Sequence, residues 1–335
     1  MKRCRKIVFI FLLFMFGVNI TVMAIENPQT KENSKPLFHG TIQINLKVGD
    51  KLDLNSPVFR IYAKDFYDGD ISKNIKVVEN NVNTKVAGSY NIKYTVANSV
   101  GNVTEINVPV KVSNDYDRTI QRKLYAGDNI WNFDLISTNR GNYHDRQNLG
   151  VYLKANASIK MRTINENVEI SGELLNDDKN TEKTFKVKNA WTTITTQYDG
   201  VPFIKTMYGI DYNPIIEINI EGMYTPDSMV KVLDYYLYGD EENSFLTQWK
   251  SSGNLFAVME SHRVTFLVPA TNREKMLVKD NSDKPYYFER VVDIFDFYHD
   301  LLNTYDRFIG LQDYTAEKIN QNVYTKYFVK ANKKR

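Results

Sequence analysis

Cysteine is nearly absent from this 335-residue chain. The single one, Cys4, lies before the apolar run near the N-terminus, so no disulfide can form within the chain. A lipid-modified cysteine would follow that run, so a lipoprotein is disfavoured, and thiol catalysis has no cysteine in the body of the chain. We expect the fold to be held together by burial of its abundant Ile, Val, Tyr and Phe side chains.

Histidine is also scarce. The four are His39, His144, His262 and His299; none is followed by Glu, and no two lie within one helical turn. A hydrolytic zinc site takes about three protein ligands, and two His one turn apart supply two of them cheaply. We therefore assign no catalytic or zinc-binding residue and interpret each His as a surface or packing residue, His299 as a helix-surface imidazole. A site assembled by the fold from scattered His and carboxylates is the alternative.

Charge of one sign is not in excess. The chain has 43 Lys and Arg against 40 Asp and Glu, and four of the basic residues fall within the first 24 positions, which hold no acidic one. The remainder is almost neutral and has no block of basic residues, so nucleic acid is not an expected partner. A Gly-x-Ser-x-Gly motif and a phosphate-binding Gly-rich loop are absent as well. A carboxylate pair for glycoside hydrolysis stays open because the chain has 40 acidic residues, although no spacing in the sequence places two of them across a cleft.

The N-terminus has the pattern of a signal peptide. A basic start is followed by 12 apolar residues, 7–18, and by Val22-Met23-Ala24, so we expect cleavage after Ala24 and a secreted or cell-surface protein. The run is shorter than the roughly 20 residues that span a bilayer, and no stable membrane span is expected after cleavage. An uncleaved anchor is the alternative. Residues 25–37 are polar and are interpreted as a linker.

Residues 38–112 alternate with a period of two. Apolar side chains occupy every second position in three runs, 42–46, 90–96 and 106–112, which is typical of strands with one buried face. Turn signals such as Asp68-Gly69-Asp70 and Gly101-Asn102 separate the runs and predict a small β-sandwich. The segment resembles the bacterial immunoglobulin-like repeats of surface and secreted proteins, which often act as spacers. Asp65, Asp68 and Asp70 are calcium candidates, and a solvated turn is the alternative.

Residues 116–335 are predicted to form a larger β-sandwich followed by helices. Alternation at 159–162 and 216–221 predicts half-buried strands, with further strands at 185–194, 201–204, 255–258 and 264–268. A polar start at 226–228 and apolar spacing over 229–237 predict a short helix. Apolar residues at helical spacing from Pro285 to Tyr305 predict a long helix, followed at 323–329 by a strand with no obvious mate. Trp131, Trp191 and Trp249 are interpreted as core residues, with sugar stacking as the alternative.

The stretch Asn148-Leu149-Gly150-Val151-Tyr152-Leu153, followed by Ile159-Lys160-Met161-Arg162, resembles the start of the enhancin-like, mucin-targeting zinc metallopeptidases (metallopeptidase family 60). Further similar segments follow in order: 201–204, 214–222, 245–249, 264–269 and 305–311. The resemblance implies a zinc peptidase that acts on host glycoproteins or mucins, with zinc bound by a later His-Glu-x-x-His motif. No position in this chain matches that motif. We therefore expect a truncated N-terminal portion without zinc or proteolytic activity; a glycan-binding or mucin-binding adhesin-type module with no enzymatic role is the alternative.

Overall fold

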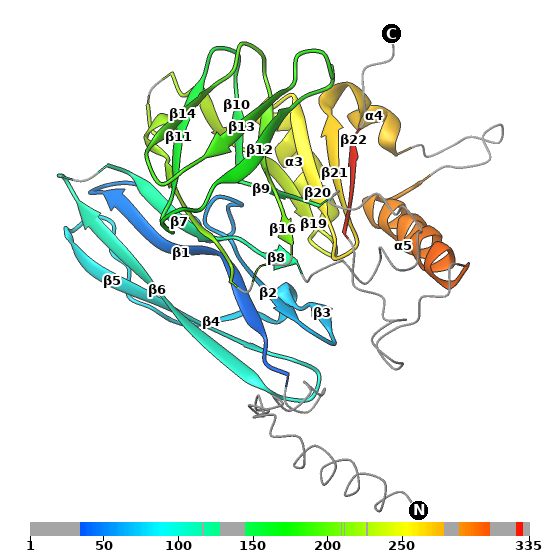
Figure 1. Ribbon diagram of the computed structural model, residues 1–335, viewed down its shortest axis with the longest axis horizontal. Helices are drawn as coiled ribbons and strands as arrows, with labels where there is room; N and C mark the ends of the chain where they lie inside the picture. Colours follow the sequence, from blue (N-terminus) through cyan, green and yellow to red (C-terminus); the bar gives the residue numbers. More distant parts are fainter. Residues whose placement is uncertain are drawn as a thin grey trace, which may run out of the picture.

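The computed structural model describes residues 34–115, 117–127, 145–208, 210, 212–225, 227–277, 288–308 and 326–330. The fold is mainly β, and its longest described helix lies near the C-terminal end (Figure 1), which confirms the predicted class. We call residues 34–113 the N-terminal region and residues 119–330 the C-terminal region. The predicted signal peptide lies outside the described residues. Among the described helices, none is long and apolar enough to cross a membrane.

The N-terminal region is a small sandwich whose first strand exchanges partners. Its elements are β1 (Leu37–Lys47), β2 (Ile61–Asp65), β3 (Gly69–Asp70), the 3-10 helix η1 (Ser72–Asn74), β4 (Lys76–Asn80), β5 (Gly88–Ala97) and β6 (Val103–Ser113). The first half of β1 pairs antiparallel with β2, and its second half pairs parallel with β6. The predicted alternation is confirmed, since Ile44 and Leu46 are buried while Asn45 between them is partly exposed.

One sheet runs through both regions. The free edge of β1 pairs antiparallel with β7 (Thr119–Lys123), and β7 pairs with β17 (Ile215–Asn219). Two further strands, β11 (Ser158–Thr163) and β14 (Thr192–Thr195), complete an order of β14-β11-β17-β7-β1-β6-β5-β4, with β2 and β3 attached to β1. A single cluster of buried side chains extends from Phe38 to Val230 beneath it. We call this ten-stranded assembly the shared sheet (Figure 1).

Three smaller sheets complete the middle of the chain. A four-stranded sheet has the order β13 (Lys183–Val187), β12 (Ile170–Leu175), β15 (Val201–Lys205) and β9 (Arg146–Asn148). The two-stranded sheets are β10 (Val151–Leu153) with β18 (Val230–Val232), and β16 (Met207–Tyr208) with β8 (Ala126–Gly127). The 3-10 helix η2 (Glu221–Met223) follows β17.

The last part packs helices against a fourth small sheet. Its strands are β19 (Asp234–Leu237), β20 (Phe256–Glu260), β21 (Val264–Pro269) and β22 (Tyr327–Lys330); its helices are α3 (Glu242–Ser252), η3 (Ala270–Asn272), α4 (Arg273–Met276) and α5 (Val291–Phe308). The predicted long helix is confirmed as α5. Its Phe295 is fully buried and packs against Phe266 of β21, with ring centroids 5.4 Å apart. Its outer end is exposed at Tyr305 and Phe308.

Two local predictions were wrong. Residues 229–237 form β18 and β19, not a helix; these strands belong to different sheets, and Leu233 is buried where the chain passes between them. The C-terminal strand does have a mate, because β22 pairs parallel with β21. The predicted linker also packs at its end: the buried Ser34 hydroxyl donates to Asp65 at 2.7 Å.

Candidate binding cleft

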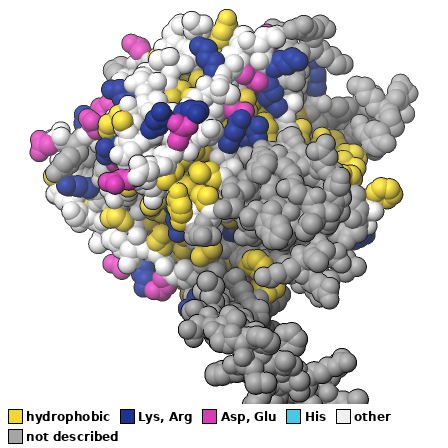
Figure 2. All heavy atoms as spheres, viewed as in Figure 1, with side chains coloured by type: hydrophobic (Ala, Val, Ile, Leu, Met, Phe, Trp, Pro, Cys, Tyr) yellow, Lys and Arg dark blue, Asp and Glu magenta, His cyan; other side chains and the backbone are white. Residues whose placement is uncertain are grey.

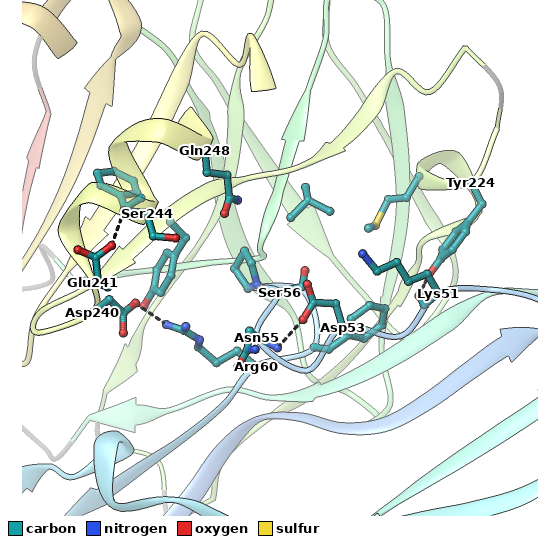
Figure 3. Close-up of a pocket in the computed structure, with 16 residues that line it drawn as sticks. Lys51, Asp53, Asn55, Ser56, Arg60, Tyr224, Asp240, Glu241, Ser244 and Gln248 are labelled. Carbon is teal, nitrogen blue, oxygen red and sulfur yellow. Dashed lines mark hydrogen bonds and ion pairs between the residues drawn. The ribbon is translucent and has the colours of Figure 1, made fainter. Parts of the chain in front are cut away.

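A cavity of about 680 Å³ lies between the two regions. One wall is residues 51–60 of the N-terminal region, and the other is formed by residues 223–248 of the C-terminal region (Figure 3). We call this cavity the cleft. Its lining combines amides, carboxylates, hydroxyls and aromatic rings, which is the mixture expected of a site for a polar ligand with apolar faces.

The N-terminal wall is a tightly bonded turn. The Asp53 carboxylate accepts the N–H of Asn55 at 3.0 Å, and the Asp53 carbonyl accepts the N–H of Ser56 at 3.0 Å. The buried Phe59 anchors the wall to the core. The Ser56 hydroxyl oxygen, which lines the cleft, is buried and makes no hydrogen bond to any described residue. A buried hydroxyl without a partner is uncommon in a protein.

The opposite wall includes one face of α3. Glu241 caps the start of this helix, and its carboxylate accepts the N–H of Asn243 at 3.1 Å. Ser244 and Gln248 are one helical turn apart and line the cleft (Figure 3). The neighbouring Phe245 and Trp249 are buried. The helix thus holds two polar side chains over the cleft on a rigid element.

A cation from the N-terminal region reaches across to the second wall. The Arg60 guanidinium lies 3.4 Å from the Asp240 carboxylate and 5.1 Å from the centre of the Tyr235 ring. Burial disfavours its charge, but Tyr235 and Asp240 outweigh burial and raise the pKa of Arg60. The Tyr235 hydroxyl donates to Glu260 at 2.7 Å, and burial together with Glu260 raises the pKa of Tyr235 well above its usual range. Arg60 is thus charged and Tyr235 neutral at physiological pH.

A second set of ion pairs joins the regions beside the cleft. The Arg118 guanidinium donates two hydrogen bonds to Asp50, at 2.7 and 2.8 Å, and one to Glu221 at 2.6 Å. It also lies 4.6 Å from the ring centre of Tyr224, which lines the cleft. Burial raises the pKa of Tyr224 to about 12, so this hydroxyl is neutral at physiological pH. The fork geometry of the Arg118 contacts fixes its orientation.

Gly150 packs tightly against the N-terminal wall. Its φ of +77° lies in the left-handed region, and a Cβ at this position would lie 2.5 Å from the backbone of Pro57 and Val58. Only glycine therefore allows the strand entry at Asn148-Leu149-Gly150 to approach the N-terminal wall so closely. The tripeptide begins the stretch 148–153 that resembles the enhancin-like peptidases, and the contact with Pro57 and Val58 gives its glycine a steric reason.

Residues 37–112 match the family described as bacterial surface protein, Ig-like domain. The N-terminal region is a bacterial Ig-like domain. One wall of the cleft therefore belongs to the Ig-like domain. This agrees with the predicted immunoglobulin-like sandwich.

More than half of the chain is similar to part of a larger protein. The viral-enhancing factor of Trichoplusia ni granulosis virus is 24% identical over 198 residues, which are 56% of this chain and 20% of the factor. The predicted resemblance to enhancins is thus confirmed as a weak similarity, and the chain spans about a fifth of the length of the factor.

The chain also resembles solved structures, and two of them serve as examples. A functionally unknown conserved protein from Bacillus anthracis str. Ames, solved as a mutant, has a TM-score of 0.47 and 12% identity, covering 63% of this chain and 41% of that one. The M60 catalytic domain of Clostridium perfringens ZmpC, solved with the sialyl T antigen, has a TM-score of 0.45 and 13% identity, covering 63% of this chain and 44% of that one. Neither likeness bears on the activity of this chain.

The calcium candidates lie at the end of β2 in the Ig-like domain. The Asp65 carboxylate accepts from Ser34, Asn98 and the N–H of Tyr67, and the Asp68 carboxylate accepts from Ser99. Asp70 accepts the N–H of Ser72 at 2.9 Å. These bonds are typical of carboxylates that organise a turn. The calcium site stays an untested prediction.

The described histidines do not fit a zinc site. The His39 ring stacks on Tyr62 with centroids 5.3 Å apart. His262 and His299, although 37 positions apart, lie with ring centroids 4.8 Å apart, and His299 bonds the Ser261 hydroxyl at 2.9 Å. No three His, Cys, Asp or Glu among the described residues are arranged to hold a metal. His299 is also half-buried against Phe295 and Tyr238, so its assignment as a helix-surface residue was wrong. His144 lies outside the described residues.

The tryptophans differ from one another. Trp249 is fully buried and donates its N–H to the Asn254 carbonyl at 3.2 Å, which confirms its core assignment. Trp191 is 41% exposed, with the Arg162 guanidinium 4.8 Å from its ring centre, so its core assignment was wrong. Trp131 lies outside the described residues. No sequence pattern singled out the cleft residues Asn55, Ser56 and Gln248, because isolated polar residues in turns and on helix surfaces carry no periodic signal.

Proposed function

We propose that this chain is an extracellular glycoprotein-binding protein, related to the front portion of glycoprotein-degrading zinc peptidases, and that the cleft is its binding site. The cleft carries the proposal. It offers amide and carboxylate groups from both walls, beside Tyr224, Tyr235 and Phe245. Sugars present hydroxyls around an apolar ring face, and such lining residues match both.

The target class is supported by the resemblance to enhancin-like peptidases and by the surface charge. On the face drawn in Figure 2, Lys and Arg side chains lie among Asp and Glu side chains, with no large patch of one sign. A nucleic-acid-binding face would instead collect basic residues. The expected partner is therefore a host glycoprotein or mucin.

Proteolysis is not part of the proposed function. The enhancin-like peptidases use a His-Glu-x-x-His motif, and no position of this sequence matches it. We therefore propose binding, without proteolysis, as the role of the cleft.

The experiment measures binding and cleavage on residues 25–335 together. Mucin immobilised on a sensor surface should bind the protein, and Gln248→Ala should weaken binding. Thr247→Ala is the matched control, because Thr247 is exposed on the same helix and does not line the cleft. Incubation with mucin or casein, with and without added Zn²⁺, should give no fragments. Chelator-sensitive cleavage, or no binding to any glycoprotein, would contradict the proposal.

Export belongs to the same proposal. The basic start and the 12-residue apolar run of the leader motivate it. Expressed in a bacterial host with its leader, the protein should be recovered outside the cytoplasm, and N-terminal sequencing should begin at Ile25. Recovery of residues 1–24 in the membrane fraction would favour an uncleaved anchor.

A further inference from the structure

We infer that the cleft selects neutral sugars over sialylated or sulfated ones, and that residues 51–60 of the Ig-like domain supply half of the recognition. The inference rests on the proposed function and specifies its ligand. It assigns the Ig-like domain a share of the binding site in place of the spacer role that its sequence suggested.

The charges in the cleft argue against an anionic ligand. Two lining residues are cations, Lys51 and Arg60, and three are acids, Asp53, Asp240 and Glu241. The side chain of Arg60 is mostly buried, lies over the Tyr235 ring, and has its charge paired with that of Asp240 at 3.4 Å. The remaining cation is Lys51, and Asp53 lines the same wall. A carboxylate or sulfate group entering the cleft would meet more negative than positive charge.

The polar groups suit neutral hydroxyls. Asn55 on the Ig-like wall and Gln248 on α3 each carry an amide that can donate and accept (Figure 3). The Gln248 side chain also hydrogen-bonds the Asp234 carboxylate, which leaves its carbonyl oxygen and one N–H for a ligand. Adjacent hydroxyls of a pyranose can do the same, so each amide can bond a pair of them. The exposed Ser244 hydroxyl on α3 lines the same cleft and adds a further group that can donate and accept.

The walls are held apart at a fixed distance before any ligand arrives. The shared sheet joins the regions through backbone hydrogen bonds, and the close approach at Gly150 positions the turn that carries Asn55 and Ser56. A preformed site loses little conformational entropy on binding, so a few hydrogen bonds can give measurable affinity. Loops that closed only on ligand would weaken binding.

The test is a titration of residues 25–335 with matched oligosaccharides by calorimetry. The panel holds neutral oligosaccharides ending in galactose, N-acetylgalactosamine or N-acetylglucosamine, and the same chains capped with sialic acid or sulfate. We expect neutral chains to bind at least ten times more tightly than their capped forms. Asn55→Ala and Gln248→Ala should each weaken neutral binding at least tenfold, and Thr247→Ala should change it less than twofold. Asp53→Lys should reduce the difference in affinity between the capped and the neutral oligosaccharides, because it replaces a negative charge in the cleft by a positive one.

The outcomes separate this inference from the proposed function. Equal or tighter binding of capped chains would overturn the neutral selectivity while leaving glycoprotein binding intact. Neutral binding that responds to Gln248→Ala but not to Asn55→Ala would overturn the role of the Ig-like domain. Failure of the protein to bind any glycan or glycoprotein would overturn both. Thermal melting of each variant shows whether a lost signal reflects unfolding.

Discussion

The Ig-like domain meets the C-terminal region in two contrasting ways. Along the shared sheet, β1 and β7 are joined by backbone hydrogen bonds over a continuous apolar core, and Ile44 pairs with Ile120. At the cleft the same two regions face each other across about 680 Å³, with polar side chains on both walls. The shared sheet fixes how the two regions are oriented, and the cleft leaves space between them for a ligand. A site between domains can therefore be rigid when a separate contact holds the domains in place.

The largest expected effect is on the shared sheet. Ile120→Ala removes a buried side chain that pairs with Ile44 on one side and Ile218 on the other. We expect a loss of about 2–5 kcal/mol in the free energy of unfolding, the usual range for Ile→Ala in a core. Urea denaturation followed by fluorescence and circular dichroism measures it. Val78→Ala on the exposed strand β4 is the control and should change stability little. Two independent transitions, with only one of them shifted, would show that the regions do not share a core.

The next effect concerns the contact between Gly150 and the N-terminal wall. Gly150→Ala forces a side chain into the backbone of Pro57 and Val58, whereas Gly101→Ala meets nothing within 4 Å. Both positions have positive φ, so both variants carry the left-handed strain of about 1–2 kcal/mol. Gly150→Ala should lose about 1–3 kcal/mol more, as overpacking does. It should also weaken mucin binding, and Gly101→Ala should not. Equal losses in the two variants would mean that the walls can move apart freely.

A smaller effect depends on pH. Burial alone would raise the pKa of Glu221, but Lys47 and Arg118 outweigh burial and hold it below its ordinary value of 4.5. The ionised form thus favours folding: this stabilisation is complete above pH 4.5 and is lost as pH falls through the lowered pKa. Glu221→Gln should reduce stability at neutral pH more than in acid below the lowered pKa. Urea midpoints under both conditions measure this, with the exposed Glu79→Gln as control. If Glu221→Gln lost as much stability in acid as at neutral pH, the ionised Glu221 carboxylate would not contribute to stability.

The smallest expected effect is that of the cleft variants on stability. Asn55 is exposed, so Asn55→Ala should change the free energy of unfolding by less than about 0.5 kcal/mol. Gln248→Ala should cost about 1 kcal/mol, because the Gln248 side chain hydrogen-bonds the buried Asp234 carboxylate. Their loss of glycan binding would then be a local effect. A drop of several degrees in melting temperature would show instead that these side chains hold the walls together.

Periodicity predicted the Ig-like domain well because each of its strands buries one face. Positions such as Val108, Val110 and Val112 are buried in strict alternation, and the signal is local. The same method failed at residues 229–237. Val230, Leu233 and Tyr236 are buried at a spacing of three, which mimics a helix, because the chain crosses from one sheet to another at Leu233. Helix α3 gave a weak signal, since only Phe245 and Trp249 are buried along it.

The cleft and the pairing of distant strands could not be predicted from local patterns. Asn55 and Gln248 lie far apart in the sequence, and an alternating pattern says which face of a strand is buried but not which strand lies beside it. For the same reason, local patterns did not predict that β1 pairs with β7 or that β22 pairs with β21. His262 and His299 also come together only through the fold. The sequence marked Gly150 through its resemblance, but the reason for a glycine there is the backbone of Pro57 and Val58.

Because of the shared sheet, the Ig-like domain does not depend on its peptide link to stay attached to the C-terminal region. Only residues 114–118 connect β6 to β7, whereas five register pairs hold β7 against β1. A protease cut within this short connection would therefore leave two fragments bound to each other by the sheet and the core. The Ig-like domain is retained by its hydrogen bonds and apolar contacts, and the peptide link serves mainly to deliver it to its place during folding.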